Sequence, residues 1–282
     1  MRINNNIAAL NTHRQYGINN NNVASSVEKL SSGYRINRAG DDAAGLAISE
    51  KMRAQIRGLN MASKNSQDAI SLIQTAEGAL QETHNILQRM RELAVQAASD
   101  TNDGDYEEGE EGEDGGVDRA ALDAEFQALL KEINDIADQT AFNTRKLLDG
   151  SLSGAVIQTG ANEGETLDIS IEDMSTTGLA INTLSLASRV NAATAISKVN
   201  EAINTVSTER SKLGAYQNRL QHKIANLDTS AENLTAAESR IRDIDMAKEM
   251  TYFTKNSILT QAATAMLAQA NALPQGVLQL LG

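Results

Sequence analysis

The sequence predicts a mainly α protein of long antiparallel helices, packed as a rod-like coiled-coil bundle with a small β-hairpin region. The strongest observation is an unbroken seven-residue apolar repeat in the C-terminal third, formed by Val199, Val206, Leu213, Leu220, Leu227, Leu234 and Ile241. A second observation is the presence of a single proline, Pro274, in 282 residues. A third is an aromatic content of only 3%, which suits thin helices joined by small side chains. Polar residues on the second seam of the repeat favour a bundle over a simple dimer: Arg210, Gln217 and Glu238.

Composition excludes several classes of function. The net charge of −12 disfavours nucleic acid and anionic membranes as partners. Without cysteine, the chain has neither disulfides nor thiolate chemistry. No window of the sequence approaches a membrane span, and MRINNNIAAL lacks the apolar core of a cleaved secretion signal. An exported protein of this kind is therefore expected to use another route.

The N-terminal 30 residues carry a thin apolar stripe that four consecutive asparagines interrupt. An isolated helix this weak is marginal in water, so it needs a partner. The C-terminal residues from Met250 are apolar enough to bind but too sparse to fold alone, and we expect Pro274 to break the helix near its end. We predict that both ends order together on assembly, through Ile3, Ile7, Leu10, Val27, Leu30, Leu273, Val277, Leu278, Leu280 and Leu281.

A polar connector, LSSGYRINRAGDDAAGLAIS, spans residues 30–49. Its glycines, Gly33 among them, indicate non-helical backbone, and Arg35 and Arg38 add two cations. Either Asp41 or Asp42 is a suitable N-cap for the helix that follows.

Two helical segments follow the connector. Residues 46–98 form an apolar stripe about 80 Å long at 1.5 Å per residue, through Met52, Leu59, Ile73, Leu80 and Leu87, then Met90 and Leu93. Residues 119–137 carry a second stripe, Leu122, Phe126, Leu129, Ile133 and Ile136, which should pack along the long helices. The long segments 46–98 and 190–240 should lie antiparallel.

Residues 100–118 contain ten acidic residues and no basic residue. Such a run with glycines predicts an exposed, poorly ordered loop. A calcium site from Asp103, Asp105, Glu107 and Glu108 is the alternative, but the glycine at 109 falls one place late for an EF-hand.

Residues 151–185 are predicted to form the hairpin region. Leu167, Ile169 and Ile171 alternate with polar residues, as in a half-buried strand. Val156 and Ile157 belong to the expected partner strand, with ANEGE as the turn.

Nothing in the chain indicates catalysis. The histidines, His13, His84 and His222, lie far apart in sequence, and no HExxH, Walker or GxSxG motif occurs. We therefore predict no enzyme activity, no catalytic residues, no metal and no cofactor.

The wording of the connector closely resembles the segment after the first terminal helix in bacterial flagellins. Further blocks extend the resemblance over nearly the whole chain, among them QRMRELAVQAA at 88–98, QTAFNTRKLL at 139–148, NLTAAESRIRDIDMAKEM at 233–250 and LAQANALPQGVLQLLG at 267–282. The family implies a structural subunit that leaves the cell unfolded, self-assembles through its terminal helices into the extracellular flagellar filament, and serves motility. Its partners would be other subunits, an export chaperone, a cap protein and hook–filament junction proteins.

The resemblance also implies a domain plan. Residues 1–32 and 246–282 would form an inner terminal-helix domain, and 33–45 with 240–245 the connectors. Residues 46–239 would form a rod-like domain that includes the acidic loop and the hairpin region. We expect no large variable outer domains, because only about 35 residues separate Gly150 from the last long helix. The alternatives are a hook–filament junction protein and a secreted coiled-coil adhesin or effector.

A last implication concerns innate immunity. Flagellins are sensed by a host Toll-like receptor, and the family's contact motif matches Arg89, Leu93, Gln96 and Glu125. Leu93 also lies on the packing stripe, so Arg89 and Glu125 are the better surface candidates.

Overall fold

The computed structural model describes residues 6–99 and 117–281, and their side chains as far as Ala272. The predicted acidic loop therefore lies outside the described residues, except for Val117 and Asp118, which begin a helix. Contacts divide the chain into two compact units. The terminal unit comprises residues 1–56 and 232–282, and the central unit comprises residues 57–231. The predicted domain boundaries were placed elsewhere and stay a prediction.

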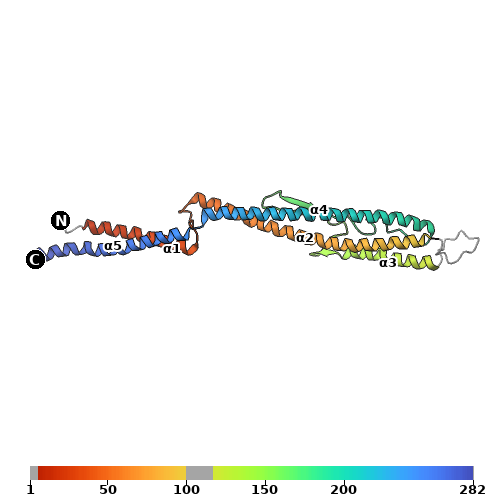
Figure 1. The fold of residues 1–282 in the computed structure, drawn as a ribbon, viewed down its shortest axis with the longest axis horizontal. Coiled ribbons are helices and arrows are strands. Elements are labelled where there is room, and N and C mark those ends of the chain that lie inside the picture. Colours follow the sequence, from red (N-terminus) through yellow and green to blue (C-terminus); the bar gives the residue numbers. More distant parts are fainter. Residues whose placement is uncertain (1–5, 100–116, 282) are drawn as a thin grey trace, which may run out of the picture. The chain divides into compact units, whose positions relative to one another are not determined.

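The terminal unit is built around two paired helices, α1 (Ile7–Ser32) and α5 (Met246–Leu281) (Figure 1). Helix α1 ends at Gly33, whose φ of 75° is left-handed and whose N–H donates to the Lys29 carbonyl at 2.9 Å. Helix α5 begins at the N-cap Asp245, whose Oδ1 accepts from the N–H groups of Ala247 and Lys248. Pairing of the terminal helices, which the thin stripes predicted, is confirmed.

The predicted break at Pro274 is wrong, because α5 continues through it to Leu281. Proline has no N–H for the carbonyl four residues earlier, which here belongs to Ala270. That carbonyl instead accepts a 2.7 Å hydrogen bond from Asn6 Nδ2. One lost backbone bond is thus replaced by a bond from the paired chain end, and the helix is not forced to stop.

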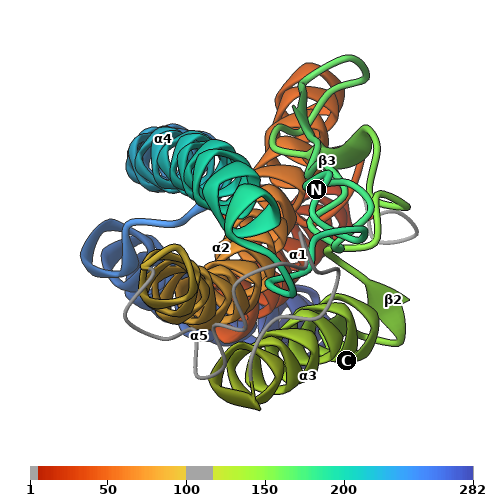
Figure 2. The same cartoon turned by 90° about the vertical axis from the view of Figure 1, so that its right-hand side faces the viewer.

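The central unit contains most of α2 (Ala43–Ala97) and α4 (Arg189–Arg242), together with α3 (Val117–Gln139). All three begin and end within three residues of the predicted bounds. Ser63 Oγ donates to Asp228 at 3.0 Å, and Gln217 Nε2 donates to Glu77 at 3.0 Å. Residue numbers rise along α2 as they fall along α4, so these helices are antiparallel, as predicted. Figure 2 shows α2, α3 and α4 end-on as neighbouring coils.

The core of the central unit follows the predicted stripes. The first four residues of the C-terminal repeat are completely buried, from Val199 to Leu220, and so are Phe126 and Ile133 of α3. On α2 the buried set moves from Ile73, Leu80 and Leu87 to Met90, Leu93 and Ala97, which is the expected drift of a seven-residue stripe. Each large apolar side chain buried in this way contributes about 1.5–3 kcal/mol.

The hairpin region is confirmed. Strands β3 (Ala155–Gln158) and β4 (Thr166–Ile169) pair antiparallel, with Ile157 opposite Leu167. Leu167 and Ile169 are buried while the residues between them face outward, so the alternation has its usual cause. Asn65 of α2 donates to the Gln158 carbonyl at 3.3 Å and holds the hairpin against the helix.

A second, shorter hairpin was not predicted. Strands β1 (Ala141–Phe142) and β2 (Arg145–Lys146) are joined by Asn143 and Thr144, both with positive φ, at 49° and 65°. Two such residues make the turn that matches strand twist, but the usual sequence signal for it is Asn-Gly. Threonine at the second position hides the turn from sequence analysis.

Arg119 closes the C-terminal end of α2. Its side chain is buried, with Nε donating to the Ala97 carbonyl at 3.0 Å and Nη2 to the Ser99 carbonyl at 3.4 Å. The last turn of α2 has no basic residue of its own. A cation from α3 therefore satisfies the final carbonyls and the negative end of the helix dipole.

We predict that Arg119→Met lowers the free energy of unfolding by about 1–3 kcal/mol, because buried carbonyls lose their donors. Urea denaturation of the full-length protein measures the loss. Arg91→Met, an exposed arginine on α2, is the matched control and should change stability by less than about 0.5 kcal/mol. Equal effects of the two substitutions would show that the cap contributes nothing.

Candidate functional site

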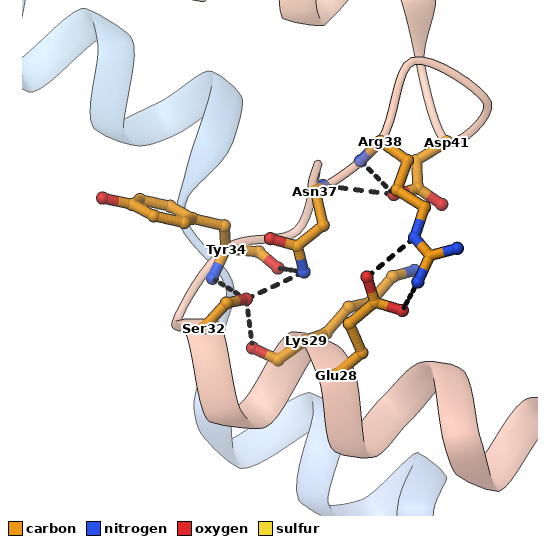
Figure 3. Close-up of polar contacts among 7 residues, drawn as sticks. All are labelled: Glu28, Lys29, Ser32, Tyr34, Asn37, Arg38 and Asp41. Atoms are coloured by element: carbon orange, nitrogen blue, oxygen red, sulfur yellow. Dashed lines mark hydrogen bonds and ion pairs between the residues drawn. The ribbon is translucent and has the colours of Figure 1, made fainter.

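Asp41 stabilises the turn of the connector between α1 and α2 by accepting backbone hydrogen bonds. Asp41 Oδ2 accepts from the N–H groups of Asn37 at 3.1 Å and Arg38 at 3.0 Å, while the Arg38 carbonyl accepts from the Asp41 N–H (Figure 3). Donation from the backbone of Arg38 and then Asn37 lowers the pKa of the Asp41 carboxyl. Its contribution to the loop is therefore present above the ordinary aspartate pKa and is lost as the pH falls through the lowered value.

The connector also folds back over the end of α1. Arg38 Nε and Nη2 bond the two carboxylate oxygens of Glu28 at 2.9 and 3.1 Å, and Asn37 Nδ2 donates to Ser32 Oγ at 2.8 Å (Figure 3). The hydrogen bond that Arg38 donates to Glu28 raises the pKa of Arg38. Because both partners of this ion pair are exposed, the pair sets geometry more than stability.

Asp42, not Asp41, caps α2. Its Oδ1 accepts from the Gly45 N–H at 2.8 Å. A Cβ at position 45 would lie 2.5 Å from Asp42 Oδ2 and 2.9 Å from Ile36 Cδ1, so a larger residue would displace the capping carboxylate or the Ile36 side chain. The two adjacent aspartates that the sequence left as alternatives thus have separate roles, one in the loop and one at the helix start.

Backbone bonds tie the end of α1 to the end of α4. The Arg35 N–H donates to the Arg242 carbonyl at 2.7 Å, and the Ile244 N–H donates to the Gly33 carbonyl at 3.1 Å. The Arg35 guanidinium also donates to the Ile241 carbonyl. The connector and the short link before α5 are therefore joined by an antiparallel backbone bridge between Tyr34 and Asp243.

The ring of Tyr34 lies where the end of α1 meets the end of α4, against two arginines. The guanidinium carbon of Arg242 is 4.8 Å from the ring centroid and that of Arg53 is 5.7 Å away, both within cation–π range. Two carboxylates offset the charges across the helices: Glu50 of α2 pairs with Arg242 at 2.5 Å, and Glu238 of α4 pairs with Arg53 at 3.3 Å. These five residues form a cluster, the junction clamp, that holds α1's end to α2 and α4.

The terminal helices keep large apolar side chains outside. Among the predicted assembly residues, Ile7, Leu10 and Val27 are 57%, 65% and 49% exposed, while Leu30 is half-buried. On α5, Ile258 and Met266 are 58% and 61% exposed. The buried residues of α1 and α5 are small or polar instead: Ser26, Asn256, Ala263 and Ala270.

Six predicted assembly residues have no described side chain. Ile3 lies outside the described residues. The backbone of α5 includes the other five, but their side chains lie beyond the described part: Leu273, Val277, Leu278, Leu280 and Leu281.

The predicted receptor residues divide between surface and core. Arg89 Nη2 and Nε lie 2.9 and 3.0 Å from Glu125 Oε1, and Arg89 Nη1 lies 3.2 Å from Glu92. The hydrogen bond that Arg89 donates to Glu125 raises the pKa of Arg89. Gln96 is exposed, whereas Leu93 is 1% exposed and belongs to the core. The structure thus brings Arg89 and Glu125 together on the surface and removes Leu93 from it.

The described residues offer surfaces for protein contact. Among them, no group of three or more His, Cys, Asp or Glu side chains is placed to hold a metal ion. No described helix is both long and apolar enough to cross a membrane. The three histidines lie on α1, α2 and α4, and His84 bonds Gln88 of its own helix at 2.9 Å.

Comparison with known families identifies the family to which this chain belongs. Residues 3–153 match the bacterial flagellin N-terminal helical region, and residues 196–281 match the C-terminal helical region. The chain belongs to the bacterial flagellin family. A flagellin is a structural subunit of the flagellar filament, and that is the role of this chain.

Individual flagellins agree over the full length. The chain is 58% identical to the flagellin of Halalkalibacterium halodurans and 54% identical to that of Bacillus subtilis, in each case over 100% of both chains. The crystal structure of Bacillus cereus flagellin has a TM-score of 0.49 and 34% identity, covering 62% of this chain and 94% of that one. The full-length matches agree with a flagellin that lacks large outer domains.

The sequence did not predict the roles of three residues, Tyr34, Asn6 and Arg119. Each acts on residues more than 15 positions away in the chain. Only the Asn6 contact had a sequence signal, the proline that leaves a carbonyl without its helical donor.

We predict that Tyr34→Leu weakens the junction clamp more than Tyr34→Phe, because phenylalanine keeps the ring face and loses only the 3.4 Å hydrogen bond that Arg53 Nη2 donates to the Tyr34 hydroxyl. Loss of two cation–π contacts should speed exchange of the Arg35 and Ile244 amide hydrogens by roughly three- to tenfold. Hydrogen exchange of the full-length protein measures this, with Tyr16→Leu of α1 as the control outside the clamp. Identical exchange in the leucine and phenylalanine variants would contradict the clamp.

Proposed function

We propose that this flagellin assembles into an extracellular filament for motility through the exposed faces of its terminal helices, after export in an unfolded state. The observation that carries the proposal is the exposure of large apolar residues on α1 and α5, whose fully buried residues are small or polar. Isolated exposed apolar residues are ordinary, but here they gather on two paired helices.

Burial by neighbouring copies would supply the driving force. Each Leu, Ile or Met side chain that moves from water into a contact contributes about 1.5–3 kcal/mol. Association must also overcome lost translational and rotational freedom, so several such residues must act together. Ile7, Leu10, Ile258 and Met266 provide such a set in the described helices, and the apolar tail after Pro274 would extend it.

The charge distribution supports close packing of these helices. No residue from Asn256 to Gly282 carries a charge, and Arg14 is the only charged residue between Ile3 and Val27 apart from a titratable histidine. Burying an unpaired charge between subunits would be costly. These stretches of the terminal helices can thus enter a many-copy contact with little such penalty.

The same features suit export. Thin stripes leave each end unable to hold a helix alone, so we infer that the ends order as subunits join, within the inner domain formed by residues 1–32 and 246–282. The export chaperone, the cap and the hook–filament junction proteins are the proposed partners at these ends. Coupling of order to assembly would keep the free subunit soluble.

We predict that Leu10→Gln and Met266→Gln each raise the critical concentration for polymerisation at least tenfold, or abolish filaments, without lowering thermal stability. Both residues are exposed, so folding does not depend on them. Seeded polymerisation, sedimentation and electron microscopy measure the effect.

The matched control is Met61→Gln, on the central unit, where methionine is 57% exposed. It should polymerise as the unsubstituted protein does. Normal filaments from both terminal variants would remove the terminal helices from the assembly surface.

A second proposed role is contact with a host Toll-like receptor through Arg89, Gln96 and Glu125. The exposed ion pair between Arg89 and Glu125 supports it, because both groups lie at the surface in one place. Leu93 is left out because it is buried.

We predict that Arg89→Ala and Glu125→Ala each weaken receptor activation by monomers about tenfold, as expected for surface residues that anchor a contact. Filament formation should be unchanged. A reporter-cell assay with purified monomers measures activation, and Lys131→Ala on the exposed side of α3 is the control. A monomer without substitutions that fails to activate the receptor would end this second role.

A further inference from the structure

Asn6 makes two hydrogen bonds at the point where α1 begins. Its Oδ1 accepts from the Ala9 N–H at 3.1 Å, which caps α1, and its Nδ2 donates to the Ala270 carbonyl of α5 at 2.7 Å. The amide side chain is one of the few that can accept and donate at once. One residue therefore both starts a helix and joins it to a chain segment 264 positions away.

The carbonyl that Asn6 reaches is one that α5 cannot satisfy in the usual way. In a regular helix the Ala270 carbonyl would accept from the N–H of residue 274, but that residue is proline. Ala270 is 8% exposed, so its surroundings offer little access to water. A buried carbonyl without a donor is costly, and Asn6 supplies the donor.

We propose that Asn6 is a positioning residue for assembly, which fixes the register of α1 against α5 at the backbone position that Pro274 leaves open; this inference rests on the proposed assembly through the terminal helices. The bond adjoins the first turn of α1, which carries the exposed Ile7 and Leu10. A single fixed register holds these two side chains at a constant position along α5. Without the bond, Ser26 is the one fully buried residue of the described helix α1 that holds it in position.

Asn6→Asp separates the two roles of the side chain. Aspartate is an equally good N-cap, but it has no donor for the Ala270 carbonyl. We expect Asn6→Asp to raise the critical concentration for polymerisation roughly tenfold and to speed amide exchange of residues 7–12 in any filaments formed. Asn20→Asp, on the exposed side of α1, brings the same charge to the same helix and should match the unsubstituted protein.

Pro274→Ala provides the decisive background. Alanine restores an N–H that can bond the Ala270 carbonyl within α5, so the carbonyl no longer needs Asn6. The double variant Asn6→Asp/Pro274→Ala should polymerise within about twofold of Pro274→Ala alone, a non-additive rescue that a role confined to capping or charge would not produce.

Three results separate the possibilities. A tenfold loss in Asn6→Asp that disappears in the Pro274→Ala background supports the proposal. An equal loss in both backgrounds, or no loss beyond that of Asn20→Asp, overturns it. Failure of the unsubstituted protein to form filaments would overturn the proposed function; exchange of the Ala9 and Asn271 amides in monomeric Asn6→Asp and its double variant then tests the Asn6 bond by itself.

Discussion

Antiparallel packing of α2 against α4 is the constraint on which the other elements depend. Its apolar residues recur every seven positions along α4, so the contact continues over many turns and buries side chains at each level. Apolar layers alone resist sliding only weakly, because one layer resembles the next. Polar contacts at Ser63–Asp228 and Gln217–Glu77 differ from their surroundings and thereby specify the register. Helix α3 and both hairpins then pack on the α2–α4 pair, whose register is fixed by these contacts.

The terminal unit uses the opposite arrangement. Its paired helices bury alanine, serine and asparagine, and they leave leucine, isoleucine and methionine exposed. A contact of small residues brings two helix backbones close together but buries little apolar area. The central unit can thus hold itself together, whereas the terminal helices leave large apolar side chains exposed, and these are the side chains that the proposed assembly would bury. Within the terminal unit, the charged and aromatic groups of the junction clamp hold the end of α1 to α2 and α4.

The elements that could be predicted from the sequence are those whose apolar residues recur at regular intervals. Heptads located α2 and α4, steps of three and four located α3, and alternation located the β3–β4 hairpin. Contacts between distant residues have no period, which is why the Tyr34 cluster, the Arg119 cap and the Asn6 bond emerged only from the structure. The proline illustrates the limit: the local rule that proline ends a helix is sound, but it cannot include a donor from the other end of the chain. Likewise, Asp41 and Asp42 are both good caps, and only the geometry at Gly45 decides between them.

The Arg119 cap has a consequence for how the chain tolerates change. Its guanidinium bonds carbonyls at the end of α2 from the start of α3, so it fixes the points between which residues 100–116 depart and return. Joining two fixed ends by a longer chain costs only about 0.6 kcal/mol for each doubling of the number of linking residues. Arg119 itself contributes a similar or larger amount to holding those ends. We therefore expect the ends of α2 and α3 to keep their positions when additional residues are inserted between 99 and 117.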